Sequence, residues 1–254
     1  MAPAGYGNRV EGTHAVLAAA RAGRVEHLYV DRGRRDRPGV REAIEEIGAD
    51  RVTVLDDVRA RATTEAPQGL VADCRPILSV TLEALRESSD ALLVLDHVED
   101  PHNLGAVARS ALAAGIGGLV VSSRRAAPLS AAAFKAAAGA LETIAVAVVG
   151  SIPEALSRLK DLGCWVVGLE PAAEQSLFGL QILTEPVAVV VGAEGPGLSR
   201  LTSDRCDLTA SIPMAEGNQS LNASVSAALA AFEIMRVRGA AGAPGRVSSA
   251  GQSS

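Results

Sequence analysis

Short, continuous runs of apolar residues recur through the second half of the chain. Each run is bounded by polar or glycine-containing segments, as is typical of strands buried on both faces of a parallel sheet. They fall at residues 91–95, 118–121, 144–149, 164–169 and 187–191. Helical patterns lie between most of them, at 104–114, 130–139 and 153–162. The pattern predicts an α/β domain with a mostly parallel sheet over residues 91–238.

The first part of the chain shows the same alternation on a smaller scale. Helices are predicted at 12–22 and 40–47 and strands at 25–30, 51–55 and 69–74, with a short helix from Asp56 or Asp57 to about Thr63. Gly23 and Gly48 end the two longer helices. These elements indicate a small α/β domain over residues 8–75. Residues 76–90 are interpreted as a linker that carries one helix.

A last helix is predicted over about 220–238. Apolar side chains recur along one of its faces, at Leu221, Val225, Phe232 and Met235. Beyond Gly239 the chain is rich in Gly, Ala and Ser without periodicity, so residues 239–254 are predicted to be disordered.

Composition narrows the possible classes of protein. No apolar run approaches the roughly 18 residues that span a bilayer, and the N-terminus lacks the basic-then-apolar pattern of a signal peptide. A cytoplasmic protein is therefore expected. Cys74, Cys164 and Cys206 form no Cys-x-x-Cys pair, and no His-Glu-x-x-His occurs. No metal site is predicted, and the cysteines are interpreted as buried small hydrophobic residues.

Charge is unevenly distributed along the chain. The formal net charge is −5, yet residues 1–75 are balanced, with 12 Arg against 12 acidic residues. The densest basic cluster, residues 32–37, contains Arg32, Arg34, Arg35 and Arg37. The cluster is either a solvated loop or a surface that contacts the phosphates of a nucleic acid. Its four arginines are candidate RNA-binding residues.

The first segment with candidate chemistry follows the strand at 91–95. Residues 96–105 leave the carboxyl end of a buried strand and enter a helix, a common ligand-binding location in open α/β sheets. Asn103 suits a helix N-cap, and Arg109 follows six residues later. Both could be structural. Alternatively, Arg109 provides a guanidinium fork for a phosphate or a developing alkoxide. The spacing of His97 and His102 fits no metal-ligand pattern.

Two further segments follow predicted strands near the C-terminus. Residues 192–197 place three glycines and Glu194 after the strand at 187–191, but they match neither Gly-x-Gly-x-x-Gly nor a Walker A loop. Ile212-Pro213-Met214 precedes Ser220-Leu221-Asn222, which is predicted to form the first turn of the last helix. Free backbone N–H groups there could hold a polar or anionic ligand. Because no Gly-x-Ser-x-Gly elbow surrounds Ser220, serine hydrolysis is poorly supported.

Together and in this order, the three segments resemble the three motifs of the SpoU (TrmH-like) family of RNA ribose 2′-O-methyltransferases, within the SPOUT superfamily. The resemblance covers residues 91–238. Residues 8–75 resemble, more weakly, the ribosomal-protein-L30-like substrate-binding domain of many members, through Gly12-Thr13-His14 and Gln68-Gly69. The arrangement is most similar to enzymes that methylate a guanosine ribose of 23S ribosomal RNA. One departure is Glu216, where the family usually has glycine.

The resemblance implies a deep trefoil knot in the C-terminal part of the sheet domain. It also implies an RNA substrate, S-adenosylmethionine as methyl donor, no metal, and a homodimer. By motif position, the implied catalytic residues are Asn103, Arg109, Glu194, Ser220 and Asn222. The implied cofactor-binding residues are Leu169, Glu170, Gly192, Ile212 and Leu221.

Other functions remain open at this point. Within the family, the substrate could be transfer RNA, or the enzyme could methylate ribosomal RNA to confer antibiotic resistance. Outside catalysis, the chain could be an RNA-binding ribosome-assembly factor with the same fold. The complete set of residues at the catalytic positions favours an active methyltransferase. A nucleotide-binding oxidoreductase is disfavoured because the dinucleotide fingerprint is missing.

Overall fold

A computed structural model describes residues 5–124, 126–193, 195, 197–215 and 220–240. The chain divides into two compact units. The first unit comprises Met1–Ser79, Glu99–Arg109 and Ala127–Ile144, and the second comprises Val80–Val98, Ser110–Ala126 and Ala145–Ser254. All but two residues of the predicted disordered tail, residues 239–254, lie outside the described residues.

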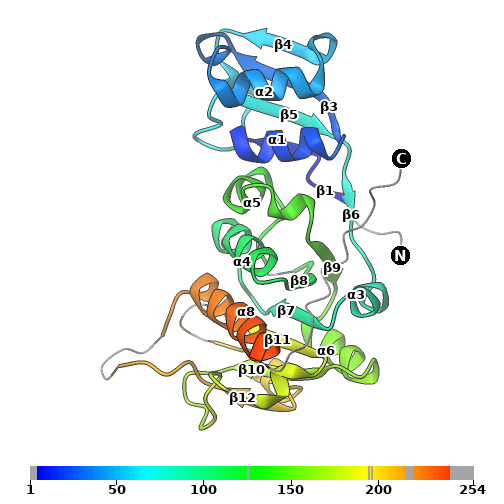
Figure 1. The fold of residues 1–254 in the computed structure, drawn as a ribbon, viewed down its shortest axis with the longest axis vertical. Helices are drawn as coiled ribbons and strands as arrows, with labels where there is room; N and C mark the ends of the chain where they lie inside the picture. Colours follow the sequence, from blue (N-terminus) through cyan, green and yellow to red (C-terminus); the bar gives the residue numbers. More distant parts are fainter. Residues whose placement is uncertain (1–4, 125, 194, 196, 216–219, 241–254) are drawn as a thin grey trace. The chain divides into compact units, whose positions relative to one another are not determined.

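The second unit is built on a six-stranded parallel sheet (Figure 1). The strand order is β12-β10-β11-β7-β8-β9, and every neighbouring pair is parallel. The strands are β7 Ala91–Leu95, β8 Gly118–Ser122, β9 Ala145–Val149, β10 Trp165–Leu169, β11 Val187–Val191 and β12 Leu208–Ala210. The five predicted strands and the predicted parallel sheet are confirmed. The short strand β12 lies outside the predicted apolar runs.

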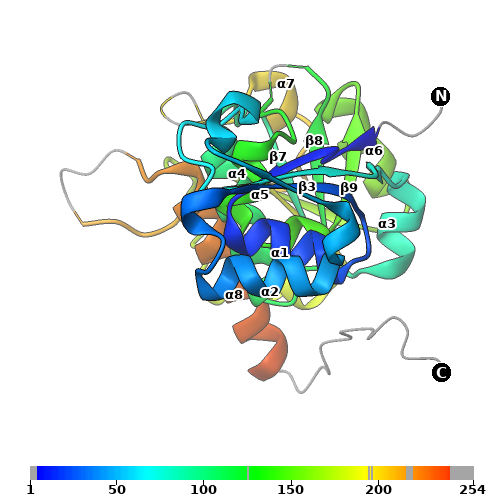
Figure 2. The ribbon, with the colours of Figure 1, turned by 90° about the horizontal axis from the view of Figure 1, so that it is seen from above.

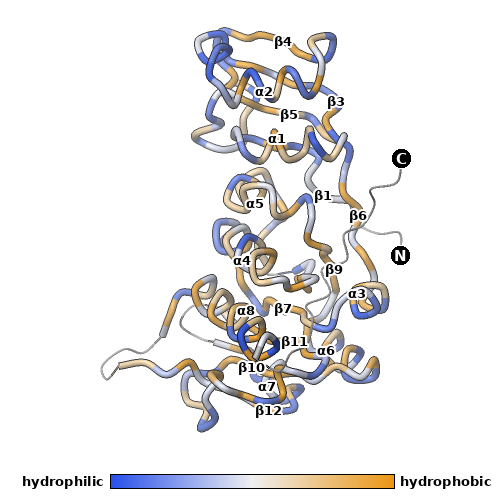
Figure 3. The backbone as a smooth tube through the Cα atoms, in the orientation of Figure 1, coloured by the Kyte–Doolittle hydropathy of each residue, from blue (hydrophilic) through white to orange (hydrophobic). Residues whose placement is uncertain are grey.

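Helices cover both faces of this sheet, which explains the continuous apolar runs. On one face, Leu92 and Val190 join a core with Leu85 of α3 (Leu82–Ser88) and Leu156 of α6 (Ile152–Asp161). Helix α8 (Ala223–Ala240) contacts β7 and β11. Figure 3 shows the mainly hydrophobic character of the central strands. Alternate side chains on a strand point to opposite faces, so burial of both faces requires apolar residues at every position.

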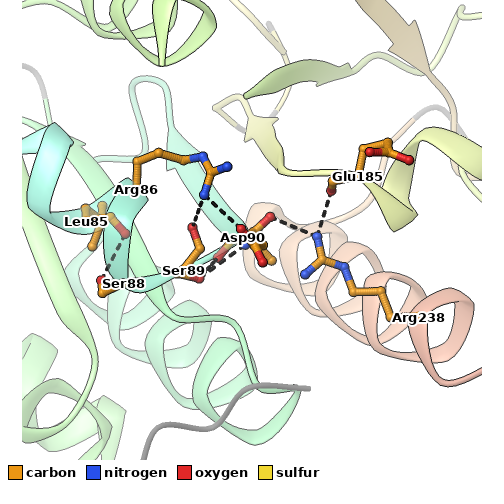
Figure 4. A network of polar contacts seen from close by, with 8 residues as sticks. Leu85, Arg86, Ser88, Ser89, Asp90, Glu185 and Arg238 are labelled. Carbon is orange, nitrogen blue, oxygen red and sulfur yellow. Dashed lines mark hydrogen bonds and ion pairs between the residues drawn. The ribbon is translucent and has the colours of Figure 1, made fainter. Parts of the chain in front are cut away.

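Arg238 holds the C-terminal end of α8 beside the points where two strands begin (Figure 4). Its guanidinium donates hydrogen bonds of 2.8 Å to the backbone oxygens of Asp90 and Glu185, and one of 3.0 Å to that of Leu183. Arg86 of α3 donates to the Asp90 carboxylate at 2.8 Å. Asp90 directly precedes β7, and Glu185 lies two residues before β11. The network therefore fixes α8 against the amino ends of both strands.

The first unit contains a smaller sheet with the order β2-β5-β3-β4. Helices α1 and α2 lie side by side along it (Figure 2). The elements are β2 Arg9–Glu11, α1 Thr13–Arg21, β3 Val25–Asp31, α2 Pro38–Ile47, β4 Val52–Leu55 and β5 Leu70–Cys74. Only β3 and β4 are parallel. The predicted strands and longer helices of this region are confirmed. The short helix predicted after Asp57 is a 3-10 turn, Val58–Arg61.

The first unit also includes segments from later in the chain. These are part of α4 (Pro101–Ala113), α5 (Ala131–Ala137) and the 3-10 turn Ala140–Glu142. Within the unit, Arg24 and Glu142 form a two-pronged ion pair, with 2.7 Å from Nε to Oε2 and 2.5 Å from Nη2 to Oε1. Their side chains are only 12% and 4% exposed, so this charge pair is buried and ties the turn between α1 and β3 to the later segment.

The remaining short elements are β1 Gly5–Tyr6, which pairs with β6 Ile77–Leu78, the 3-10 turns Arg32–Arg34, Ala49–Arg51 and Gln181–Thr184, and helix α7 Arg200–Ser203. The trefoil knot stays a prediction.

Two helices begin at other residues than the sequence indicates. Helix α4 begins at Pro101, and the Asp100 carboxylate accepts the backbone N–H of His102 at 2.8 Å. The cap is therefore Asp100, and the expectation of Asn103 as N-cap is wrong. Asn103 lies within the first turn, because Pro101 readily occupies the first position of a helix.

Helix α8 begins at Ala223, three residues later than predicted. The side-chain oxygen of Asn222 accepts the backbone N–H groups of Ser224 at 2.8 Å and of Val225 at 3.4 Å. Asn222 is thus the residue that caps α8. The expectation that Ser220 and Asn222 lie in the first helical turn is wrong, and Ser220 precedes the helix.

Candidate functional site

An open pocket lies in the second unit where the loops after β10, β11 and β12 approach the start of α8. Its described lining residues are Leu169, Glu170, Pro171, Val191, Gly192, Ala193, Gly195, Gly197, Ile212, Met214, Ser220, Leu221, Ala223 and Ser226. The pocket is therefore at the carboxyl ends of parallel strands, a common place for ligands in α/β sheets.

All five residues that the sequence indicated for cofactor binding line this pocket: Leu169, Glu170, Gly192, Ile212 and Leu221. Most of the wall is apolar or glycine backbone. Glu170 is the one charged side chain among the described lining residues. Such a wall suits a ligand with a flat apolar part and several hydrogen-bonding groups.

Gly192 has no room for a side chain. A Cβ at this position would lie 2.2 Å from the carbonyl carbon of Gly197 and 2.5 Å from the backbone nitrogen of Leu198. The loop closes on itself, because the N–H of Gly197 donates to the oxygen of Ala193 at 3.1 Å. Gly195 and Gly197 have φ angles of 83° and 70°, which glycine adopts readily. The glycines thus bring bare backbone to the pocket wall.

Asp96, the first residue after β7, anchors the far end of this loop. Its side chain is almost fully buried, and its Oδ2 accepts the backbone N–H of Ser199 at 2.9 Å. Its Oδ1 lies 2.8 Å from Nδ1 of His97. Sequence reasoning missed Asp96 as a site-supporting residue. The sequence feature that could have identified Asp96 is its position as a carboxylate directly after a continuous apolar strand.

Sequence reasoning also missed several lining residues. Pro171 and Ser226 belong to the pocket wall although only their neighbours were singled out. Met214 also belongs to the wall; it was named as part of the Ile212-Pro213-Met214 segment but not as a cofactor-binding residue. Met214 and Pro171 lie within two residues of an indicated position. Ser226 could have been found from its place one helical turn after Asn222.

The residues indicated for catalysis are distributed between the two units. Ser220 is exposed and lines the pocket, whereas Asn222 caps α8 and is not among the described lining residues. Asn103 is partly buried and Arg109 is exposed, both on the part of α4 that belongs to the first unit. Glu194 lies outside the described residues, as does Glu216, which replaces the expected glycine.

The basic cluster of the first unit has mixed surroundings. Arg32 donates through Nε to Asp56 at 2.7 Å, and both side chains are largely exposed. Arg35 and Arg37 are exposed, whereas Arg34 is partly buried. Arg34 and Arg37 line one hollow together with residues at the start of α1.

In the part of the chain that the structure describes, no three His, Cys, Asp or Glu side chains are grouped as a metal site would require. In the same residues, no helix has both the length and the apolar character needed to cross a bilayer. Burial raises the pKa of Cys74 and Cys206 to about 12 and that of Cys164 to about 11, so these thiols stay protonated near neutral pH.

The sequence matches two family profiles and several curated relatives. The profile of the SpoU rRNA Methylase family matches residues 90–232, and that of the RNA 2′-O ribose methyltransferase substrate binding family matches residues 9–79. The chain is 39% identical to the 23S rRNA (guanosine-2′-O-)-methyltransferase RlmB of Pseudomonas syringae pv. tomato, over 91% of this chain and 96% of the relative. It is 38% identical to RlmB of Ralstonia nicotianae, over 89% and 94% of the two chains.

Solved structures agree with this result. The SpoU methyltransferase AviRb from Streptomyces viridochromogenes, in complex with the cofactor AdoMet, superposes with a TM-score of 0.77 at 26% identity, over 91% of this chain and 89% of that one. A crystal structure of an RNA 2′-O ribose methyltransferase superposes with a TM-score of 0.75 at 31% identity, over 91% and 88%.

Proposed function

The chain belongs to the SpoU rRNA methylase family of S-adenosylmethionine-dependent RNA 2′-O-ribose methyltransferases, and on this basis we propose that its substrate is a guanosine ribose of 23S ribosomal RNA. The names of relatives with 38% and 39% identity over about nine tenths of the chain support this substrate. The observation that carries catalysis, rather than mere RNA binding, is the formed pocket that gathers Leu169, Gly192, Ile212 and Leu221.

The pocket residues fit S-adenosylmethionine. Apolar side chains of Leu169, Ile212 and Leu221 would cover its adenine, and the backbone exposed at Gly192 would offer hydrogen-bonding groups. Glu170 would hold hydroxyl or cationic groups of the cofactor. When bound, S-adenosylmethionine supplies an electrophilic methyl group on a sulfonium centre.

The catalytic residues act on the RNA ribose. A ribose 2′-hydroxyl is a weak nucleophile, so the enzyme must position it and stabilise the negative charge that develops on its oxygen. Arg109 supplies this charge stabilisation and holds an adjacent phosphate with its planar guanidinium. It is not the proton acceptor, because a guanidinium stays protonated in proteins. The proton leaves to phosphate or water.

The other proposed catalytic residues position groups around this chemistry. Asn103 and Glu194 orient Arg109 and the ribose. Ser220 forms part of the pocket floor. Asn222 fixes the start of α8 through the hydrogen bonds to Ser224 and Val225, and so sets the position of the pocket wall.

A second copy of the chain completes the enzyme in this proposal. Val225, Phe232 and Met235 on α8 are 45%, 43% and 44% exposed. Their spacings of seven and three residues place them on one face of the helix. Exposed large apolar side chains gathered on one helix face are characteristic of an interface, so we assign this face to homodimer contact.

The two domains have different roles in the proposed RNA methyltransferase. Residues 8–75 bind RNA, with the arginine cluster at Arg32, Arg34, Arg35 and Arg37 as its proposed contact surface. Residues 91–238 bind the cofactor and carry out methyl transfer. A ribosomal RNA substrate makes the cytoplasm the place of action.

Transfer of labelled methyl groups tests the substrate. Purified protein is incubated with methyl-labelled S-adenosylmethionine and either unmodified 23S ribosomal RNA or unmodified transfer RNA, followed by digestion to nucleosides. Label in 2′-O-methylguanosine from 23S RNA alone is the expected result. Label in transfer RNA would reassign the substrate. Cofactor binding without label in either RNA, including assembly intermediates of the large subunit, would contradict the proposed catalysis.

A further inference from the structure

A hollow in the first unit is formed where α1 and α2 begin, and it is called the α1–α2 hollow here. It is lined by Thr13 and His14 of α1, by Arg37, Gly39 and Val40 around the start of α2, and by Arg34 and Gln68. No carboxylate is among its described lining residues. A neighbouring hollow shares Arg34 and Gln68 but is lined by four carboxylates, those of Asp31, Asp56, Asp57 and Glu65. Of these two hollows, the α1–α2 hollow is therefore the one whose described lining carries a net positive charge.

Arg34 and Arg37 differ from five other arginines of the first unit, which form ion pairs. Five arginines of the first unit each face a carboxylate at 2.5–2.7 Å: Arg9 with Asp73, Arg21 with Glu42, Arg24 with Glu142, Arg32 with Asp56, and Arg59 with Asp57. Within the described part of the chain, neither Arg34 nor Arg37 forms an ion pair. Arg34 also borders the neighbouring hollow with its carboxylates, but an anion bound in the α1–α2 hollow would meet no carboxylate among the described lining residues.

The walls of the hollow are held in place by contacts of their own. The backbone N–H of Thr13 donates to Oε1 of Gln68 at 3.1 Å. A Cβ on Gly39 would lie 2.4 Å from Cγ2 of Thr13, so α1 and α2 begin in close contact. The stem of Arg34 packs against Gly69, where a Cβ would lie 2.5 Å from Cδ. A binding site with pre-formed walls loses less conformational entropy when its ligand binds.

We infer that the α1–α2 hollow binds a backbone phosphate of the RNA substrate, with Arg34 and Arg37 as its charged ligands. Guanidinium groups match the oxygens of a phosphate in a planar fork. His14 is exposed at the same wall and Gln68 adds an amide, so both can donate to phosphate or ribose oxygens. The amino ends of α1 and α2 are the positive ends of their helix dipoles, which add to the positive potential.

This inference rests on the proposed function, because it takes RNA as the ligand. It also narrows the proposed contact surface. Arg32 is held by Asp56, and Arg35 is not among the lining residues. The phosphate contact is therefore assigned to two of the four clustered arginines rather than to the cluster as a whole.

Salt dependence of RNA binding provides the test. Binding of unmodified 23S RNA transcript is measured over a series of salt concentrations for wild type and for Arg34→Gln/Arg37→Gln. The matched control is Arg21→Gln/Arg59→Gln, which removes the same charge from the same unit at positions that already face carboxylates. Here K is the association constant for RNA, and its log–log slope against salt concentration is negative. In the hollow variant, the magnitude of this slope should be smaller than in wild type by about 1 to 2, and RNA binding should be roughly ten-fold weaker. The control should keep the wild-type slope.

Two further readouts separate phosphate binding from loss of structure. Arg37→Gln alone changes an exposed side chain, so it should lower the slope by about half as much while the melting temperature stays at the wild-type value. In methyl transfer, the hollow variant should raise KM for RNA and leave both kcat and the Kd for S-adenosylmethionine unchanged.

The inference is overturned if the hollow variant and the control have the same slope. That result, together with normal methyl transfer by wild type, would leave the proposed function intact. The opposite result is also informative. If wild type transfers no methyl group to RNA, the proposed function is overturned. If the hollow variant nevertheless has a smaller salt dependence of RNA binding than wild type, the hollow is supported as a phosphate site.

Discussion

The backbone N–H of Ser199 donates a 2.9 Å hydrogen bond to the buried carboxylate of Asp96, although 103 residues separate the two in sequence. The bond joins the end of β7 to the segment that follows the glycine-rich loop. Since Gly192, Gly195 and Gly197 of that loop line the candidate cofactor pocket, Asp96 supports the pocket without lining it.

Replacement of Asp96 should therefore weaken both the fold and the pocket. Asp96→Ala leaves the N–H of Ser199 and the ring of His97 without their acceptor, and the expected loss is about 2–4 kcal/mol in the free energy of unfolding. S-adenosylmethionine binding should weaken as well. Chemical denaturation and calorimetric titration measure the two effects. Asp161→Ala, at an exposed position at the end of α6, should alter neither. Wild-type stability and affinity in Asp96→Ala would contradict this role.

A side chain at Gly192 should block cofactor binding. In Gly192→Ala, the new methyl group would collide with the backbone of Gly197 at 2.2 Å, so the loop must move to accommodate it. The expected result is at least a ten-fold rise in the Kd for S-adenosylmethionine, equivalent to about 1.4 kcal/mol. Gly150→Ala is the matched control, because a Cβ at Gly150 meets no atom within 4 Å. Equal affinities of the two variants would show that the loop tolerates a side chain.

Loss of the Arg109 guanidinium should slow methyl transfer without affecting the cofactor. Arg109→Ala should lower kcat by about 10²–10³, the effect of removing one group that stabilises developing negative charge. Arg109→Lys keeps the charge but loses the planar fork and should recover only part of the rate. Single-turnover methyl transfer and cofactor titration provide the measurements. A full-rate Arg109→Ala enzyme would remove Arg109 from the mechanism.

A charge on the exposed face of α8 should break the proposed homodimer. Phe232→Glu buries a carboxylate in an apolar interface, which costs several kcal/mol if the second copy covers this face. Size-exclusion chromatography with light scattering should give a dimer for wild type and a monomer for the variant. Leu201→Glu, on α7 at a side chain that is 70% exposed, should remain dimeric. A monomeric wild type at micromolar concentration would refute the assignment.

Glu11 should make the stability of the first unit depend on pH. Burial raises the pKa of this carboxyl, but hydrogen bonds from the backbone and hydroxyl groups of Thr63 and Thr64 outweigh burial, and the net pKa lies below the usual 4.5. A depressed folded-state pKa adds stability above about 4.5, and this stability is lost as the pH falls through the folded-state pKa.

The comparison with Glu11→Gln measures this contribution. The variant should be less stable than wild type by about 1–3 kcal/mol at pH 7, because an amide N–H then faces the donors of Thr63 or Thr64. The difference should shrink as the pH is lowered below 4. Urea denaturation at pH 7, 5 and 3 gives the curve. A difference that does not change with pH would mean that ionisation of Glu11 contributes nothing.

Several features were accessible from sequence because they depend on local chemistry. Strands β7 to β11 are buried on both faces. Each of them therefore needs consecutive apolar residues, and such runs can be recognised in the sequence. The cofactor positions follow instead from the resemblance to the SpoU motifs, which implies Gly192, Ile212 and Leu221, and these three residues line one pocket. Helix starts were less accurate, because Asp100 and Asn222 compete with Asn103 and Ser220 as caps and the sequence does not rank them.

The tertiary structure alone decided which distant segments meet. The order β12-β10-β11-β7-β8-β9 brings the loop after Leu169 to the loop after Val191, and Asp96 to Ser199, although no local pattern links these residues. It also decided that Arg32 faces Asp56 while Arg34 and Arg37 share a hollow free of described carboxylates. Sequence patterns record whether a residue prefers burial or exposure. The choice of partner depends on non-local packing, in which many weak contacts are satisfied together.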